Sequence, residues 1–76
     1  MPKRRLIEDI VQHPTRFYRA PFDVVRDRRF SDEERLQILG AWEREVREHD
    51  GEAIAADLAR IDEARSEVQR RQTGVH

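Results

Sequence analysis

The hydrophobic residues of this 76-residue chain recur at helical intervals in three separate stretches. The first stretch is Lys3 to Gln12, where four large apolar side chains fall on one side of a helix: Leu6, Ile7, Ile10 and Val11. Pro14 ends this helix, because the residue before a proline is pushed out of the helical region. A helix of about three turns is marginal in water by itself. We therefore expect its apolar side to pack against the rest of the chain.

The second stretch begins with a capping box. Ser31 is followed three residues later by Glu34, directly before an apolar run. The acidic residues of this first turn also complement the positive end of the helix dipole. These signals predict a helix over residues 32–50. Its apolar stripe is Leu36, Leu39, Trp42, Val46 and His49, with Ile38 on a flank beside Trp42.

Gly51 separates this helix from a third periodic stretch. Glycine suits the left-handed backbone with which many helices end. We predict a further helix over residues 52–72, whose alanines allow a neighbouring helix to come close. Its apolar stripe is Ile54, Leu58, Ile61, either Ala64 or Arg65, and Val68. The stripe thins after Val68, so we expect residues 73–76 to form a disordered tail.

Four of the five aromatic residues lie between the first two helices, at Phe17, Tyr18, Phe22 and Phe30. Pro21 is placed to begin a single helical turn over residues 21–27. We interpret residues 14–30 as an ordered connector whose aromatic side chains cap one end of a hairpin. The predicted fold is therefore all-α and forms one domain over residues 1–76. It is an antiparallel helical hairpin of 32–50 and 52–72, with the short N-terminal helix 3–12 packed through the aromatic connector.

Size and composition limit the classes of protein to which this chain can belong. A chain of 76 residues without cysteine has no disulfide to stabilise its small core, so association with a partner is expected. The three histidines, His13, His49 and His76, lack the spacing of a structural zinc site, and we expect no metal or cofactor. No run approaches the roughly 20 apolar residues of a membrane span, and no apolar stretch follows the basic start as in a signal peptide. We expect a cytoplasmic protein without a membrane partner.

Charge is distributed unevenly along the chain. Residues 1–30 carry eight basic and four acidic side chains, whereas residues 31–76 carry seven basic and twelve acidic ones. The basic half can fold onto the acidic half, pair with a second copy, or bind a polyanion. Five arginines interleaved with the aromatic residues are the candidate polyanion contacts: Arg16, Arg19, Arg26, Arg28 and Arg29. A pI of about 6.3 argues against binding of a polyanion.

The residues available for catalysis are few. The chain has one lysine, no cysteine, two serines and two threonines, and Ser31 is already assigned as a helix cap. Carboxylates at helical spacing, such as Glu43 four residues before Arg47, are typical of a solvated face. His49 either responds to pH or caps the end of its helix. A two-helix hairpin also offers no deep pocket, so we predict that the protein is not an enzyme.

These observations favour a small, non-catalytic protein-interaction module that self-associates through apolar helix faces. The predicted core or interface anchors are Leu36, Leu39, Trp42, Val46, Ile54, Leu58, Ile61 and Val68. The candidate partner surface is Leu6, Ile10, Phe17, Tyr18, Phe22 and Ile38. The alternative is a nucleic-acid-binding accessory protein that uses the basic, aromatic-rich N-terminal part.

The run from Pro21 to Glu43 resembles a group of small uncharacterised bacterial helical proteins. In that group a proline-aspartate-valine-valine-like segment precedes a capped helix whose core stripe ends in Trp-Glu. The corresponding residues here are Pro21, Asp23, Val24, Val25, Asp27, Ser31, Glu34, Ile38, Leu39, Trp42 and Glu43. The resemblance covers about a third of the chain. It implies a helical fold and no particular activity.

Overall fold

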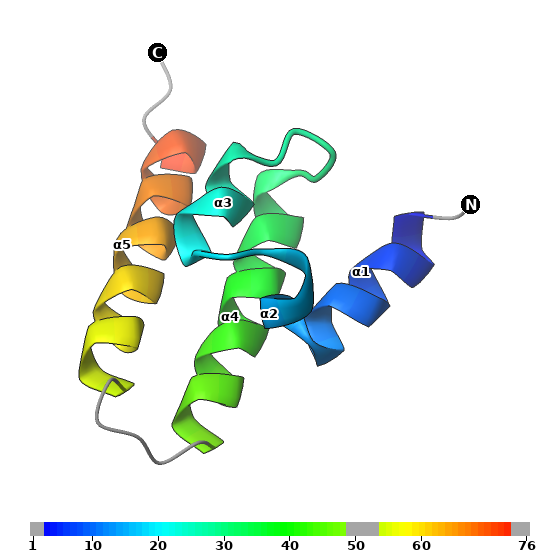
Figure 1. Cartoon of the computed structure of the whole chain (residues 1–76). Coiled ribbons are helices and arrows are strands. Elements are labelled where there is room, and N and C mark those ends of the chain that lie inside the picture. The colour runs from blue at the N-terminus through cyan, green and yellow to red at the C-terminus, as the bar shows by residue number, and fades with distance from the viewer. Residues whose placement is uncertain (1–2, 49–53, 74–76) are drawn as a thin grey trace.

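The computed structural model describes residues 3–48 and 54–73, which form five α-helices (Figure 1). Their bounds are α1 Lys3–Gln12, α2 Pro14–Phe17, α3 Pro21–Arg26, α4 Asp32–Glu48 and α5 Ile54–Thr73. No strand occurs in these two ranges, which confirms the all-α class. The turn predicted at Gly51, the role of His49 and the tail at 74–76 lie outside the described residues. Thr73, predicted to begin the tail, is the last residue of α5.

The segment between α1 and α4 is more helical than expected, because two prolines each begin a helix. Pro14 begins α2 and Pro21 begins α3, and the fixed backbone angle of proline suits this position. His13, before the first proline, has a non-helical backbone with φ −144° and ψ 70°. The Ala20 N–H donates to Asp23 Oδ2 at 3.2 Å and so caps the start of α3. The predicted connector is thus two short helices and not a single turn.

The capping box at the start of α4 is confirmed. The Glu34 N–H donates to Ser31 Oγ at 3.2 Å, and the Ser31 N–H donates to Glu34 Oε1 at 2.7 Å. The Arg35 N–H donates to the Ser31 carbonyl at 2.9 Å, which is the first bond of the helix ladder. Free N–H groups of the first turn therefore find acceptors within four residues of chain.

Replacing Ser31 with alanine is expected to lower the free energy of unfolding by about 1 kcal/mol, because one N–H of the first turn of α4 loses its acceptor. The matched control is Ser66→Ala, since Ser66 is an exposed serine within α5. That control should be neutral or slightly stabilising, because alanine has the higher helix propensity. Urea unfolding followed by circular dichroism measures both changes. Equal losses in the two variants would contradict the capping role.

Helix α4 is the central element of the fold. Helices α4 and α5 lie side by side and run in opposite directions, α3 packs against both of them, and α1 and α2 pack against α4 (Figure 1). The principal extents are 39 × 32 × 16 Å. Packed helix axes lie about 8–10 Å apart, so the thinnest direction accommodates two layers of helices. The N-terminal helices therefore cover only one face of the α4–α5 pair.

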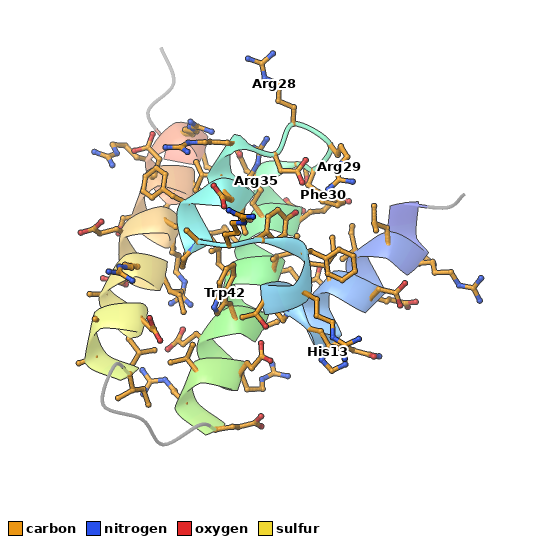
Figure 2. The ribbon with its side chains drawn as sticks, in the orientation of Figure 1. His13, Arg28, Arg29, Phe30, Arg35 and Trp42 are labelled. Carbon is orange, nitrogen blue, oxygen red and sulfur yellow. The ribbon has the colours of Figure 1, made fainter. Side chains whose placement is uncertain are left out.

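The hydrophobic core draws side chains from α1, α3, α4 and α5 and from the loop residues Tyr18 and Phe30. Its buried members are Ile7, Ile10, Tyr18, Val24, Val25, Phe30, Ile38, Leu39, Trp42, Ile61, Ala64 and Val68. The indole of Trp42 stacks on the Tyr18 ring, with centroids 6.5 Å apart and an interplanar angle of 28°. This contact joins the segment after α2 to the middle of α4, near the centre of the molecule (Figure 2).

Two arginines from other helices bond the C-terminal end of α3. The Arg35 guanidinium of α4 donates to the Asp27 carbonyl at 2.8 and 3.1 Å, and Arg71 of α5 donates to the Val25 carbonyl at 3.2 Å. The last carbonyls of a helix have no partner within it and carry the negative end of its dipole. Positive donors at this position therefore hold the six-residue α3 against both long helices.

Asp27 organises the loop that follows α3. Its carboxylate accepts hydrogen bonds from Tyr18 Oη at 2.8 Å and from Arg29 Nε and Nη2 at 3.0 and 2.8 Å. The Arg29 backbone N–H donates to Asp27 Oδ1 at 3.0 Å. Hydrogen bonds from Arg29 hold the pKa of Asp27 well below its usual range, despite the opposing effect of burial. Burial, followed by the neighbouring Asp27 carboxylate, raises the pKa of Tyr18. This cluster fixes the course of the chain from α3 to α4.

Candidate interaction surface

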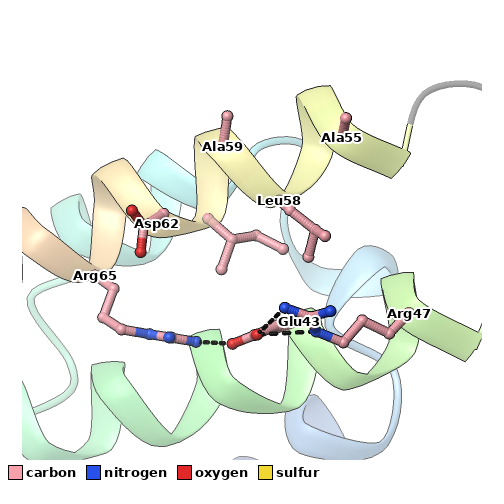
Figure 3. Close-up of a pocket in the computed structure, with 8 residues that line it drawn as sticks. Glu43, Arg47, Ala55, Leu58, Ala59, Asp62 and Arg65 are labelled. Atoms are coloured by element: carbon pink, nitrogen blue, oxygen red, sulfur yellow. Dashed lines mark hydrogen bonds and ion pairs between the residues drawn. The ribbon is translucent and has the colours of Figure 1, made fainter.

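An open hollow of about 300 Å³ lies between α4 and α5. Figure 3 looks onto this hollow with the N-terminal helices behind the α4–α5 pair, so it lies on the outer face, the face turned away from α3. Its lining is part apolar and part charged. The apolar lining residues are Ala55, Leu58, Ala59 and Ile61, and the charged ones are Glu43, Arg47, Asp62 and Arg65.

The apolar side chains at this end of the α4–α5 pair are only partly covered. Val46, Ile54 and Leu58 are half-buried, whereas Ala64 and Val68 further along α5 are fully buried. The difference follows from helix length, since at about 1.5 Å per residue α3 spans roughly 9 Å and α5 roughly 30 Å. Helix α3 lies beside the C-terminal half of α5 (Figure 1). Apolar side chains on the N-terminal half of α5 are therefore only partly covered by the rest of the described chain.

Glu43 links the two helices across the hollow (Figure 3). Its carboxylate accepts a hydrogen bond from Arg47 Nε at 3.0 Å, as the spacing of four predicts, and another from Arg65 Nη2 of α5. These bonds, Arg65 first and Arg47 second, lower the pKa of Glu43. An ionised carboxylate held by two guanidinium groups is a weak base, so its role here is to join helices. The sequence places Arg65 only as an alternative to Ala64 on the stripe, and its pairing with Glu43 was not predicted because the two residues lie 22 positions apart.

The predicted anchors divide between fully buried and half-buried residues. Leu39, Trp42, Ile61 and Val68 are buried. Leu36, Val46, Ile54 and Leu58 are half-buried, and of these four Leu58 lines the hollow. Leu36 and Val46 pack against the core from opposite ends of α4.

The predicted partner surface requires correction. Ile10 and Ile38 are 0% exposed and Tyr18 is 8% exposed, so all three are core residues of a single chain. Helix α1 packs against α4, and Tyr18 packs against Trp42. The remaining residues are accessible: Phe17 is 44% exposed, Phe22 is 36% exposed and Leu6 is half-buried.

The five candidate polyanion contacts differ in their surroundings. Arg29 is bound to Asp27 and lies 5.3 Å from the Phe30 ring centroid. Arg26 lies 5.9 Å from the Phe22 ring centroid, and Arg28 points away from the body of the molecule (Figure 2). Arg16 and Arg19 are exposed.

Nucleic-acid binding through these arginines stays a prediction. Contacts to phosphates would make binding to any DNA duplex weaken steeply between about 50 and 200 mM salt, because bound counterions are released. Fluorescence anisotropy of a labelled duplex measures this. Absence of binding at the lower salt concentration would remove the alternative.

Metal sites and membrane-spanning helices are two further possibilities for residues 3–48 and 54–73. In these ranges no group of three or more histidine, cysteine, aspartate or glutamate side chains is arranged to hold a metal ion. None of the described helices combines the length and apolar character needed to cross a membrane. No family model, curated protein or solved structure matches the chain.

Proposed function

We propose that this protein is a small interaction module that self-associates through the outer face of α4 and α5. The observation that carries the proposal is the hollow between α4 and α5, whose lining includes the half-buried Leu58 and the exposed Ala55 and Ala59. Covering this surface would remove apolar area from water, at about 25 cal/mol per Å². A thin, 76-residue fold has few other ways to gain stability.

The charges around the hollow suit contact with an identical surface. Glu43 and Asp62 carry negative charge, while Arg47 and Arg65 carry positive charge. In a two-fold dimer the same patch faces itself, so a patch of a single sign would repel its copy. Because charges of both signs surround the hollow, each charged group can meet an opposite charge on the second copy. This balance favours a second copy over a strongly charged partner.

Self-association through the outer face can be tested by comparing substitutions at two alanine positions of α5. Ala59 lines the hollow, whereas Ala56 is also exposed but does not line it. Ala59→Glu should weaken self-association by more than about tenfold, because a charge would be buried against apolar surface. Ala56→Glu, with the same change in charge and side chain, should leave association within about twofold of the unmodified protein.

Sedimentation equilibrium from about 1 µM to about 1 mM measures these associations, a range that covers micromolar dissociation constants. The unmodified chain should approach twice its mass of 9.1 kDa. A monomer throughout the range would refute self-association. If Phe17→Ser or Phe22→Ser abolished association while Ala59→Glu did not, the contact would lie at the exposed aromatic residues and not on the outer face.

A further inference from the structure

Gly40 lies in the interior of α4, a position where glycine is destabilising. Glycine is about 0.8–1.0 kcal/mol less favourable than alanine in a helix interior. The backbone of Gly40 is ordinary helix, and none of the described glycines has a positive φ. A Cβ atom added at Gly40 would meet nothing within 4 Å. Neither backbone conformation nor packing within the chain therefore requires the absence of a side chain.

The position of Gly40 places it on the outer face of the α4–α5 pair. It precedes Glu43 by three residues and Arg47 by seven, so all three lie on one side of α4. Glu43 and Arg47 line the hollow, and the exposed Ala55 and Ala59 border it on α5. Small side chains on both helices allow another helix axis to come close to this face.

Gly40 is also the central residue of α4, since the helix extends eight residues on either side, from Asp32 to Glu48. An antiparallel copy of α4 centred on Gly40 would overlap the whole helix. Glu33 lies seven residues before Gly40 and Arg47 seven residues after it, so both lie on the same side of α4 as Gly40. Both are exposed, and the Arg47 side chain is 61% accessible while bonded to Glu43.

We propose that Gly40 is the close-approach point of a two-fold dimer in which α4 packs antiparallel against α4 of a second copy. This inference rests on the proposed self-association and specifies its geometry. The two-fold axis passes beside Gly40. It brings Arg47 of each chain opposite Glu33 of the second copy, so two ion pairs flank the central contact. The charge pattern of α4 is thus complementary to itself in this antiparallel register.

The first test replaces Gly40 with leucine. A large side chain at the closest approach should weaken dimerisation by more than about tenfold, because the helix axes are forced apart. The melting temperature of the monomer, measured below the dissociation constant, should rise, because leucine is the better helix former. Ala56→Leu is the matched control and should leave dimerisation unchanged. A Gly40→Leu chain that dimerises like the unmodified protein would overturn the inference.

The second test uses charge reversal. In a homodimer, Glu33→Arg places two positive groups opposite each other at both contacts, and Arg47→Glu places two negative groups there. Each variant alone should therefore dimerise more weakly than the unmodified chain. Mixed in equal amounts, the two variants should form a heterodimer, because opposite charges then meet at both contacts. Sedimentation equilibrium of the mixture against each separate variant measures this.

The outcomes separate this geometry from the broader proposal. Heterodimer formation by the mixture would support the antiparallel α4 contact, since a role of either residue within one chain does not predict rescue by mixing. A dimeric unmodified chain, with no effect of Gly40→Leu or of the charge reversals, would overturn this geometry and leave self-association standing. A chain that is monomeric up to about 1 mM would refute both.

Discussion

Trp42→Ala is expected to remove most of the stability of this protein. Trp42 is 5% exposed, lies near the middle of α4 and stacks on Tyr18. Truncation of a buried tryptophan costs about 3–5 kcal/mol, from lost burial together with the cavity left behind. A small domain has only about 5–15 kcal/mol of total stability, and a 76-residue chain lies toward the lower end of that range. We therefore expect a partly unfolded chain at 25 °C.

Urea unfolding followed by far-ultraviolet circular dichroism measures this loss, since the variant lacks the indole fluorophore. The control is Phe22→Ala, which removes an aromatic ring that is 36% exposed on α3. Its cost should be about 1–2 kcal/mol, because the ring realises only about two thirds of the roughly 1.5–3 kcal/mol that full burial of a phenylalanine contributes. A Trp42→Ala chain that unfolds at the same urea concentration as the Phe22→Ala chain would show that Trp42 does not anchor the core.

The parts of the fold that local signals specify could be predicted from the sequence. The capping box depends on Ser31 and Glu34, which are only three residues apart, and its two hydrogen bonds are present as predicted. The stripe of α1 likewise supplies Ile7 and Ile10 to the core. Helix α2 was missed because four residues, two of them polar, are too few to show a period of 3.6. Its only signal is the proline at its first position.

Contacts between distant segments could not be predicted in this way. Ile38 lies off the main stripe of α4 and was assigned to a surface, yet α1 packs on α4 and Ile38 is fully buried. The hydrogen bond from Arg71 to the Val25 carbonyl joins residues 46 positions apart, and no spacing rule relates them. Both contacts were missed for the same reason. Periodicity identifies the apolar side of a helix, but it does not identify which distant segment packs against that side.

At the candidate surface, too, local contacts could be predicted from the sequence and contacts between distant segments could not. The i, i+4 rule predicts that Glu43 pairs with Arg47, but only the alignment of α4 with α5 brings Arg65 to the same carboxylate. Gly40 is visible in the sequence as a glycine inside a helix, a pattern that often has a packing reason. Its significance depends on knowing that the space beside it is empty in a single chain. The outer face is therefore defined by what the fold leaves uncovered.

Asp27→Asn is expected to cause the largest polar loss of stability. The Asp27 side chain is 11% exposed and binds Tyr18 and Arg29. Hydrogen bonds to a charged group contribute about 1.5–3 kcal/mol, and an asparagine cannot accept both bonds from the guanidinium. The contribution of Arg29, which is 59% exposed, is reduced by solvent screening. We therefore expect a loss of about 1.5–2 kcal/mol at pH 7.

The loss should depend on pH in a defined direction. Because the folded state lowers the pKa of Asp27 from its ordinary value of 3.8, ionised Asp27 stabilises the fold fully at pH values well above 3.8. That stabilisation decreases as the pH falls through 3.8 and toward the lower folded pKa. The difference in unfolding free energy between the unmodified chain and Asp27→Asn should therefore shrink between about pH 5 and pH 2.

Thermal unfolding at intervals of pH gives this profile, with Asp9→Asn as the control at an exposed aspartate of α1. That control should lie close to the unmodified chain at every pH, because surface substitutions change stability by less than about 0.5 kcal/mol. A constant difference for Asp27→Asn down to pH 2 would mean that the substitution acts through packing and not through the charge of Asp27. The bonds from Tyr18 and Arg29 would then position the loop without stabilising it electrostatically.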